Sequence, residues 1–264
     1  MNNAIGVFDS GVGGLTVARE IMRQLPNETI YYFGDVKNCP YGDKTKEEII
    51  KNTDRAVKFL IDKGVKLVVL ACNTATAAAL DYLQSKYEVP IIGVVQPGAR
   101  RAIQATENNK VLVLGTKFTA NSKVYDIEIE NINSDIIVFD KACPAFVPFI
   151  ESEGNLDKEA TKNLISDTLG NTNTLGVDTV VLGCTHYPIL KKDIEDYYGN
   201  NIKVISSGRE AAREVSTVLG YAKLHQKKLN KKEHRFFISQ ESDNFNSIAS
   251  KWLKKDINAE VVEI

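Results

Sequence analysis

The sequence predicts an α/β protein built from two similar doubly wound parallel-sheet domains that face each other across a cleft. Short apolar runs alternate with helical patterns along the chain, and this alternation is typical of parallel sheets covered by helices. The segment 64–74 recurs at 176–186, and other strand segments have weaker counterparts in the second half. Internal repeats of this kind indicate duplication of a structural unit.

Eight apolar segments have the length and the valine, isoleucine and leucine content of buried strands. They are residues 4–8, 30–33, 67–70, 91–95, 111–114, 136–139, 179–182 and 204–205. Helical patterns are clearest at 46–63, 75–86 and 158–169, and a further helix is expected to begin near Leu15. No low-complexity linker divides the chain.

The strongest repeat pairs GVKLVVLACNT (64–74) with GVDTVVLGCTH (176–186), so that the same spacing separates Gly64 from Gly176 and Cys72 from Cys184. Three weaker pairs are IYYFGDVKNCP with IIVFDKACP, IGVFDSG with VLVLGTK, and IIGVV with IKVIS. Buried strands share apolar letters in any case. That likeness does not explain the shared glycine and cysteine, which therefore favour two related halves.

Composition excludes several classes of protein. The chain has 264 residues, 43% of them hydrophobic and 25% charged, as in an ordinary globular protein. A net charge of −1 provides no field for nucleic acid or for a membrane surface, so neither is expected as a partner. No apolar run is long enough to span a bilayer, and the N-terminus MNNAIGVFDS lacks the features of a signal peptide, so a cytoplasmic location is expected. Four cysteines without a CxxC pair argue against a disulfide framework or a zinc site.

Polar residues follow the predicted strands, where ligands bind in sheets of this class. Asn73 or Thr74 is expected to cap the next helix, and Pro188 suits a first helical turn. The basic stretch 223–235 is expected to be a solvated helix end and connection, with His225 and His234 in solvent. The residues at the predicted strand tips are Asp9, Ser10, Asp35, Cys72, Asn73, Thr74, Thr116, Cys184, Thr185 and His186.

The thiols at these tips are candidates for chemistry. A free thiol has a pKa of about 8.5, which a helix N-terminus lowers, so Cys72 and Cys184 are expected to be bases or nucleophiles. The alternative is that each is an inert buried thiol. Cys39 and Cys143 lie in Cys-Pro turns and are expected to be structural.

The turn DSGVGGLT (9–16) places Asp9 directly after a predicted strand, so this acid is expected to be functional unless it merely caps the following helix. The turn lacks the third glycine of a dinucleotide fingerprint and the Gly-Lys-Ser/Thr of a P-loop. It can still present N–H groups to a carboxylate.

Two similar halves related by a pseudo-twofold axis would bring Cys72 and Cys184 together across a cleft. A planar intermediate between them could lose a proton from one face and gain one on the other, which is the chemistry of racemisation or epimerisation. A pair that forms a disulfide is a competing interpretation, but it would not need Asn73, Thr185 and His186 nearby.

Six motifs resemble those of the cofactor-independent aspartate/glutamate racemase family, and of its glutamate racemases in particular. They run in family order from residue 5 to about residue 190, and CNTAT together with GCTHYP is the most specific combination. Ser206 stands where many relatives carry an acid. The motifs are IGVFDSGVGGLTV, YFGDVKNCPYGDK, VVLACNTATAAAL, IIGVVQPGAR, ACPAFVPFIESEG and VVLGCTHYPIL.

The resemblance implies that Cys72 acts on the D-enantiomer and Cys184 on the L-enantiomer. It implies that Asp9 supports Cys72, and that His186 and Glu151 assist Cys184. It implies one domain from residues 1–96 and 207–264, and a second from 97–206. The implied substrate-binding residues are Asp9, Ser10, Pro40, Tyr41, Gly42, Asn73, Thr74, Thr116, Thr185 and His186.

The resemblance also implies that glutamate is the substrate, that no cofactor or metal takes part, and that the chain forms a homodimer. The product, D-glutamate, would supply peptidoglycan synthesis. One alternative is a racemase for a related acidic amino acid such as aspartate. Another is an α/β module that binds an anionic ligand without turnover, for which two symmetric thiols would be superfluous.

Overall fold

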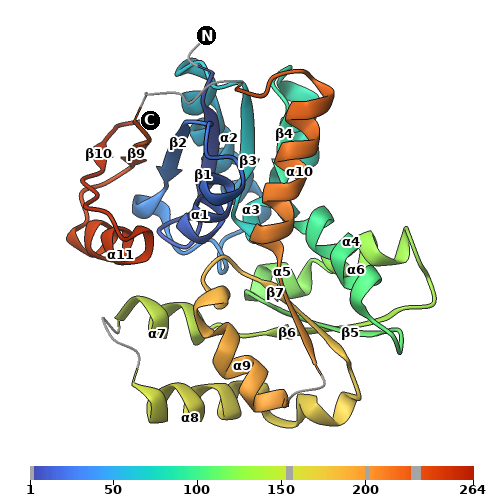
Figure 1. Ribbon diagram of the computed structural model, residues 1–264. Helices are drawn as coiled ribbons and strands as arrows, with labels where there is room; N and C mark the ends of the chain where they lie inside the picture. Colours follow the sequence, from blue (N-terminus) through green and yellow to red (C-terminus); the bar gives the residue numbers. More distant parts are fainter. Residues whose placement is uncertain (1–2, 153–156, 200–201, 227–232) are drawn as a thin grey trace.

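The computed structural model describes residues 3–152, 157–199, 202–226 and 233–264, in which the chain forms two parallel sheets flanked by helices (Figure 1). The predicted fold class of two α/β domains is therefore confirmed. The end of the motif ACPAFVPFIESEG and the middle of the basic stretch 223–235 lie outside the described residues. Among the described residues, none of the helices is both long and apolar enough to cross a membrane.

The first sheet has the strand order β10-β9-β2-β1-β3-β4, and every neighbouring pair is parallel. All residues of β1, β2 and β3 are buried because helices cover both faces of the sheet. The strands are β1 (Ile5–Asp9), β2 (Ile30–Gly34), β3 (Leu67–Leu70), β4 (Ile91–Gly93), β9 (Arg235–Ile238) and β10 (Glu260–Val261).

The second sheet has the order β6-β5-β7-β8, again with parallel neighbours throughout. This order matches β2-β1-β3-β4 of the first sheet, strand for strand in chain order, as the sequence repeat predicts. The strands that carry the strongest repeat, β3 and β7, therefore occupy equivalent positions. The strands of the second sheet are β5 (Lys110–Gly115), β6 (Ile137–Ala142), β7 (Thr179–Gly183) and β8 (Lys203–Ser206).

Helices follow most strands, and the three predicted at 46–63, 75–86 and 158–169 are confirmed. Helix α2 begins with a reciprocal capping box between Thr45 and Glu48. The helices are α1 (Leu15–Gln24), α2 (Lys46–Asp62), α3 (Asn73–Lys86), α4 (Val95–Ala105), α5 (Lys117–Asn121), α6 (Val124–Glu130), α7 (Phe146–Ser152), α8 (Lys158–Leu169), α9 (Lys191–Tyr198), α10 (Ser207–Tyr221) and α11 (Asp243–Leu253), with 3₁₀ turns at Val36–Asn38, Gly170–Leu175 and Tyr187–Leu190.

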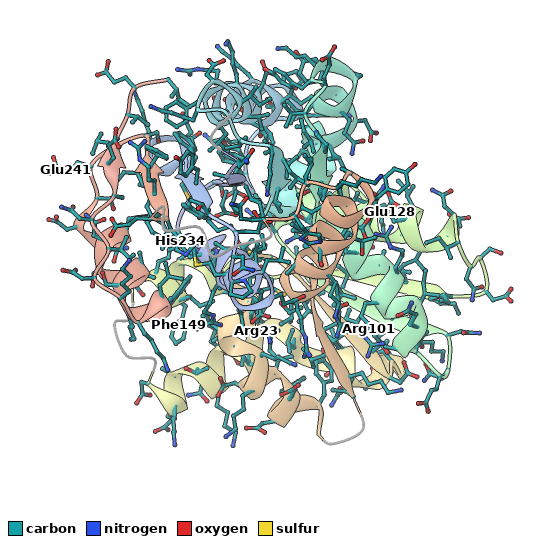
Figure 2. All side chains as sticks on the ribbon, turned by 45° about the horizontal axis from the view of Figure 1, so that its top comes forward. Arg23, Arg101, Glu128, Phe149, His234 and Glu241 are labelled. Carbon is teal, nitrogen blue, oxygen red and sulfur yellow. The ribbon has the colours of Figure 1, made fainter. Side chains whose placement is uncertain are left out.

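Apolar side chains form a separate cluster on each face of each sheet. Alternate residues of β1 illustrate this, since Val7 joins the cluster beneath α1 and α10 while Phe8 joins the one beneath α2 and α3. Trp252 of α11 packs against one cluster of each sheet and so joins the two domains. Charged side chains such as Arg23 and Glu241 lie on the exposed surface (Figure 2).

Three expectations about secondary structure and burial need correction. The strand predicted at 91–95 ends at Gly93, because α4 begins at Val95. The predicted connection after α10 leads into β9, which adds to the outer edge of β2. His234 is not solvated: it is half-buried beside the first sheet (Figure 2), and its Nδ1 accepts a hydrogen bond from the Ile30 N–H at 3.1 Å.

Candidate active site

The carboxyl ends of β1, β3 and β7 meet around a small cavity of about 30 Å³ between the two sheets. Both Cys72 and Cys184 line it, as the duplication predicts. Most of the other residues expected to bind substrate line it as well, whereas Asp9 does not, and Glu151 lines a neighbouring cavity instead. The lining residues are Ser10, Cys39, Pro40, Tyr41, Gly42, Cys72, Asn73, Thr74, Thr116, Val147, Gly183, Cys184, Thr185 and His186.

Cys72 forms the N-cap of α3, a position that was expected for Asn73 or Thr74. Its sulphur accepts the N–H of Ala75 at 3.5 Å and lies 3.7 Å from the Ser10 hydroxyl oxygen. The expectation of a lowered pKa is wrong for this thiol. Burial, reinforced by the nearby Asp9 carboxylate, raises the pKa of Cys72 from 9.0 to about 12, although the Ala75 N–H opposes the rise.

Asp9 ends β1 and is completely buried. The glycine turn presents N–H groups to a carboxylate as predicted, but the carboxylate is that of Asp9, which accepts the Gly11 N–H at 3.1 Å. The pKa of Asp9 is raised from its ordinary value because of burial. The charge of His186 and hydrogen bonds from Gly11, Gly14 and Thr185 oppose this rise. Gly14 has no side chain for a steric reason, since a Cβ there would lie 2.4 Å from the Cβ of Asp9.

The turn after β1 is fastened to the strand tip of the second sheet. The Thr185 hydroxyl donates to Asp9 at 3.3 Å, and the Thr16 hydroxyl donates to the Thr185 carbonyl at 2.8 Å. Gly13 permits this close approach, because a Cβ there would lie 2.3 Å from the Thr185 hydroxyl oxygen and 2.4 Å from Nδ1 of His186.

His186 links Cys184 to Glu151. Its Nδ1 lies 3.9 Å from the Cys184 sulphur, and its Nε2 lies 2.7 Å from Oε1 of Glu151 on α7. Burial alone would lower the pKa of His186, but Cys184 and Glu151 together raise it from 6.5 to about 10. The imidazole is therefore protonated near neutral pH and places a positive charge beside the Cys184 sulphur. The Trp252 ring packs edge-on against it, with ring centres 6.1 Å apart.

Threonine hydroxyl groups from both domains lie close together at the wall of the small cavity. The Thr74 hydroxyl at the start of α3 lies 2.9 Å from that of Thr116, which caps α5, and 3.3 Å from that of Thr119. The neighbouring Asn73 side chain accepts a hydrogen bond from the Tyr125 hydroxyl at 2.7 Å. These contacts set polar donors side by side on the cavity wall.

Tyr41 lines the cavity, but its hydroxyl donates to the buried carboxylate of Asp35 at 2.6 Å. Asp35 also accepts the amide of Asn38 and the hydroxyl of Ser239, which follows β9. Asp35 therefore holds the loop of Pro40, Tyr41 and Gly42 in place rather than facing the cavity itself.

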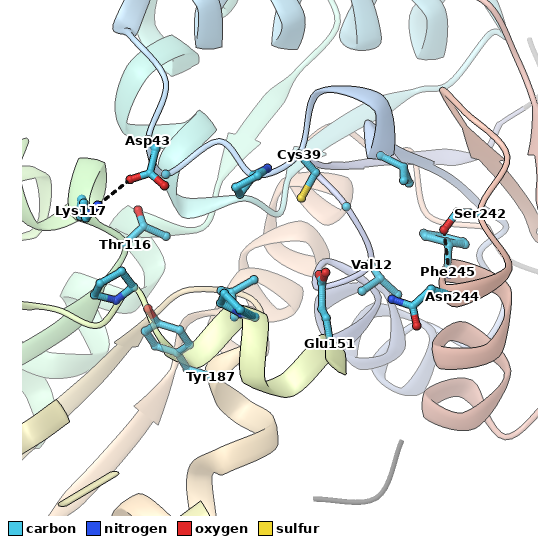
Figure 3. A pocket seen from close by; sticks show the side chains of 17 residues that line it. Val12, Cys39, Asp43, Thr116, Lys117, Glu151, Tyr187, Ser242, Asn244 and Phe245 are labelled. Carbon is cyan, nitrogen blue, oxygen red and sulfur yellow. Dashed lines mark hydrogen bonds and ion pairs between the residues drawn. The ribbon is translucent and has the colours of Figure 1, made fainter. Parts of the chain in front are cut away.

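A larger cavity of about 400 Å³ adjoins the first, and several residues line both (Figure 3). Cys39 and Glu151 face into it from opposite sides in Figure 3, and Asp43 and Lys117 form an ion pair of 3.1 Å at its rim. Cys39 was expected to be a structural cysteine in a Cys-Pro turn, but its side chain lines both cavities. Burial raises the pKa of its thiol. Cys143 is buried in the apolar cluster between the second sheet and helices α7 and α8, as expected for a structural cysteine.

None of the described histidine, cysteine, aspartate and glutamate residues form a group of three that could hold a metal ion. The groups available for chemistry at the cavity are the two thiols, the His186–Glu151 pair, the buried Asp9 and a polar wall formed by Asn73, Thr74, Thr116 and Thr185.

Comparison with known proteins gives a consistent result. Residues 5–215 match the model of a family described as Asp/Glu/Hydantoin racemase. The chain is 47% identical to a glutamate racemase from Staphylococcus haemolyticus over 264 residues, which cover 100% of this chain and 99% of that protein. A glutamate racemase isoform from Bacillus anthracis superposes with a TM-score of 0.95 at 40% identity, covering 99% and 98% of the two chains. One from Francisella tularensis, in complex with D-glutamate, superposes with a TM-score of 0.92 at 34% identity and the same coverage.

Proposed function

The chain belongs to the Asp/Glu/hydantoin racemase family, and from this premise we propose that it is an enzyme that interconverts L-glutamate and D-glutamate. Its similarity to glutamate racemases over its whole length supports glutamate as the substrate. The observation that carries the proposal is the position of Cys72 and Cys184, which line one cavity from the tips of equivalent strands.

We propose a proton transfer with two bases. From L-glutamate, the Cys184 thiolate removes the Cα proton and becomes a thiol, while the Cys72 thiol gives its proton to the opposite face and becomes a thiolate. The reaction from D-glutamate is the reverse. One C–H bond breaks, one forms, and no electrons are gained or lost, so the step balances without a cofactor or a metal ion.

The charges around the thiols suit this division of roles. The protonated His186 compensates negative charge on Cys184 when that sulphur is the base, and Glu151 holds the imidazole in place. Burial keeps Cys72 in its thiol form as the acid. The same raised pKa makes Cys72 a strong base once it has lost its proton, which is how Asp9 would support it from the D-side.

Substrate binding is assigned to the polar wall. Glutamate carries two carboxylates, and the N–H groups at the start of α3 together with the side chains of Asn73, Thr74, Thr116 and Thr185 are suited to binding anions. Ser10, Pro40, Tyr41 and Gly42 would complete the enclosure. Exclusion of water from so small a cavity strengthens each of these hydrogen bonds.

Several wider features are part of the proposal. We place the enzyme in the cytoplasm as a homodimer that supplies D-glutamate for peptidoglycan, without nucleic acid or membrane as a partner. We also propose the domain boundaries at 96 and 207. Support for these boundaries comes from α4 and α10, which begin at Val95 and Ser207 directly after β4 and β8, an edge strand of each sheet.

The direct test is to incubate the purified protein with L-glutamate alone and to separate the enantiomers by chiral chromatography. The proposal expects the mixture to approach equal amounts of the two enantiomers. The same assay with L-aspartate tests the alternative substrate. Binding of glutamate without formation of any D-enantiomer would identify a module without catalytic activity.

A further inference from the structure

The Asn73 side chain has one satisfied atom and one unsatisfied atom. Its Oδ1 accepts the Tyr125 hydroxyl at 2.7 Å, whereas its Nδ2 is buried without a hydrogen-bond partner among the described residues. Asn73 is 2% exposed and lines the cavity that holds both thiols. An unsatisfied buried amide is unfavourable by itself, so its persistence points to a partner that the chain does not supply.

The Tyr125 hydroxyl contacts a third residue, Ser207, as well as Asn73. The single proton of Tyr125 is donated to Oδ1 of Asn73, so in the side-chain hydrogen bond between Ser207 and Tyr125 the serine hydroxyl donates to the phenol oxygen. This chain of donors, from Ser207 to Tyr125 to Asn73, fixes which end of the carboxamide is the oxygen.

Tyr125 is held tightly in the position that this chain requires. A Cβ added at Gly98 would lie 3.2 Å from the Tyr125 hydroxyl oxygen, and one added at Gly183 would lie 3.3 Å from its ring. Gly183 directly precedes Cys184, so the ring packs immediately behind the tip of β7. Tyr125 lies on α6 beside the second sheet, whereas Asn73 begins α3 of the first sheet, and the hydrogen bond therefore joins the two domains.

We propose that Tyr125 is a positioning residue, which orients the Asn73 amide so that Nδ2 donates to a carboxylate of bound glutamate. Without the Tyr125 hydroxyl, the carboxamide could turn over and present Oδ1, which repels a carboxylate. This role rests on the proposed function. Since both enantiomers carry the same carboxylates, the effect should appear with each of them.

The test is the Tyr125→Phe variant, assayed with L-glutamate and with D-glutamate. A hydrogen bond to a charged group is lost, so KM should rise about tenfold or more for both enantiomers, with a smaller change in kcat. Ser207→Ala should act in the same direction but more weakly, because the Tyr125 hydroxyl can then reverse. Tyr198→Phe is the matched control: it removes a tyrosine hydroxyl that contacts Thr172 at 2.6 Å and lines neither cavity, so it should leave KM unchanged.

A second measurement separates positioning from a merely structural role. On an Asn73→Ala background, Tyr125→Phe should add almost nothing to KM, because the amide that it orients is already gone. A Tyr125→Phe enzyme with the wild-type KM for both enantiomers would overturn the proposal, as would an equally large effect on the Asn73→Ala background. If Tyr125→Phe does not fold, Ser207→Ala with unchanged KM decides against it. A wild-type protein that does not racemise glutamate would instead reject the proposed function.

Discussion

Cys72 and Cys184 follow β3 and β7, which hold the same place in two sheets of the same strand order, and both thiols line one cavity. Their surroundings differ: Cys72 lies near the carboxylate of Asp9, and Cys184 lies beside the His186–Glu151 pair. The duplicated framework therefore supplies symmetry, while the neighbouring residues place each thiol beside a different charged group.

The first prediction ranks the four cysteines. Cys72→Ala and Cys184→Ala should each lower kcat/KM by about a thousandfold or more, because each removes one of the two proton carriers. Cys143→Ala should cost about 1 kcal/mol of stability through lost packing and leave kcat/KM nearly unchanged. Cys39→Ala should lie between, since the residue lines the cavity without carrying a proton. Steady-state kinetics and thermal melts of the four variants would check this ranking. A Cys143→Ala variant that folds but is inactive, while Cys72→Ala or Cys184→Ala stays active, would contradict it.

The second prediction concerns the His186–Glu151 pair. Glu151→Gln should reduce kcat/KM about tenfold and His186→Gln about a hundredfold, since the imidazolium touches the sulphur and the carboxylate only holds it. Because the two enantiomers have equal free energy, each variant must lower kcat/KM by the same factor in both directions. The double variant should be little worse than His186→Gln alone. Fully additive losses would show that Glu151 acts independently of the imidazole.

The third prediction is a pH dependence of stability. Folding raises the pKa of His186 from 6.5 to about 10, so the folded state keeps a proton that the unfolded chain loses between these values. The stability that this proton contributes is fully present below about pH 6.5 and disappears as pH rises through about 10. Urea unfolding of wild type and His186→Gln at several pH values should therefore show a difference that shrinks with rising pH. A difference that grows with pH would contradict the assignment.

The fourth prediction concerns a buried ion pair at the other end of the first sheet. Lys66 and Glu28 have side chains only 3% and 2% exposed, and their charges lie 2.6 Å apart. Lys66→Met would leave the buried Glu28 carboxylate without its lysine partner, with only the exposed His225 imidazole 3.9 Å away, and should cost about 3–5 kcal/mol of unfolding free energy. The matched control, Lys58→Met, breaks an exposed pair with Asp62 and should cost less than about 0.5 kcal/mol. Chemical denaturation of both variants makes the comparison, and equal losses would contradict it.

Much of the fold could be predicted because β1 to β8 are apolar runs whose spacing repeats. Strands β9 and β10 were missed for physical reasons: RFFI follows a highly charged stretch, and Glu260–Val261 is short and exposed. Most of the residues predicted at strand tips line the cavity, since parallel strands end at one edge of a sheet, but Asp9 and Asp35 do not.

Properties that depend on three-dimensional surroundings could not be predicted in this way. The position of Cys72 before a helix suggested a lowered pKa, but its burial near Asp9 outweighs the helix N-terminus. Tyr125 lies in the amphipathic stretch VYDIEIE, where nothing local distinguishes it from a core residue. Its contact with Asn73 arises only when the two domains meet.

The measurement that tests the two-base mechanism most directly is deuterium incorporation at Cα during the first turnovers in D2O. With two thiols, the proton removed from one face is not the proton returned to the other, and the donating thiol has already exchanged with solvent. From L-glutamate, the D-product should therefore carry deuterium while recovered L-substrate remains almost entirely protium, and D-glutamate should give the mirror pattern. Initial product that keeps substantial protium at Cα, from either enantiomer, would show a single shuttling base and contradict the account.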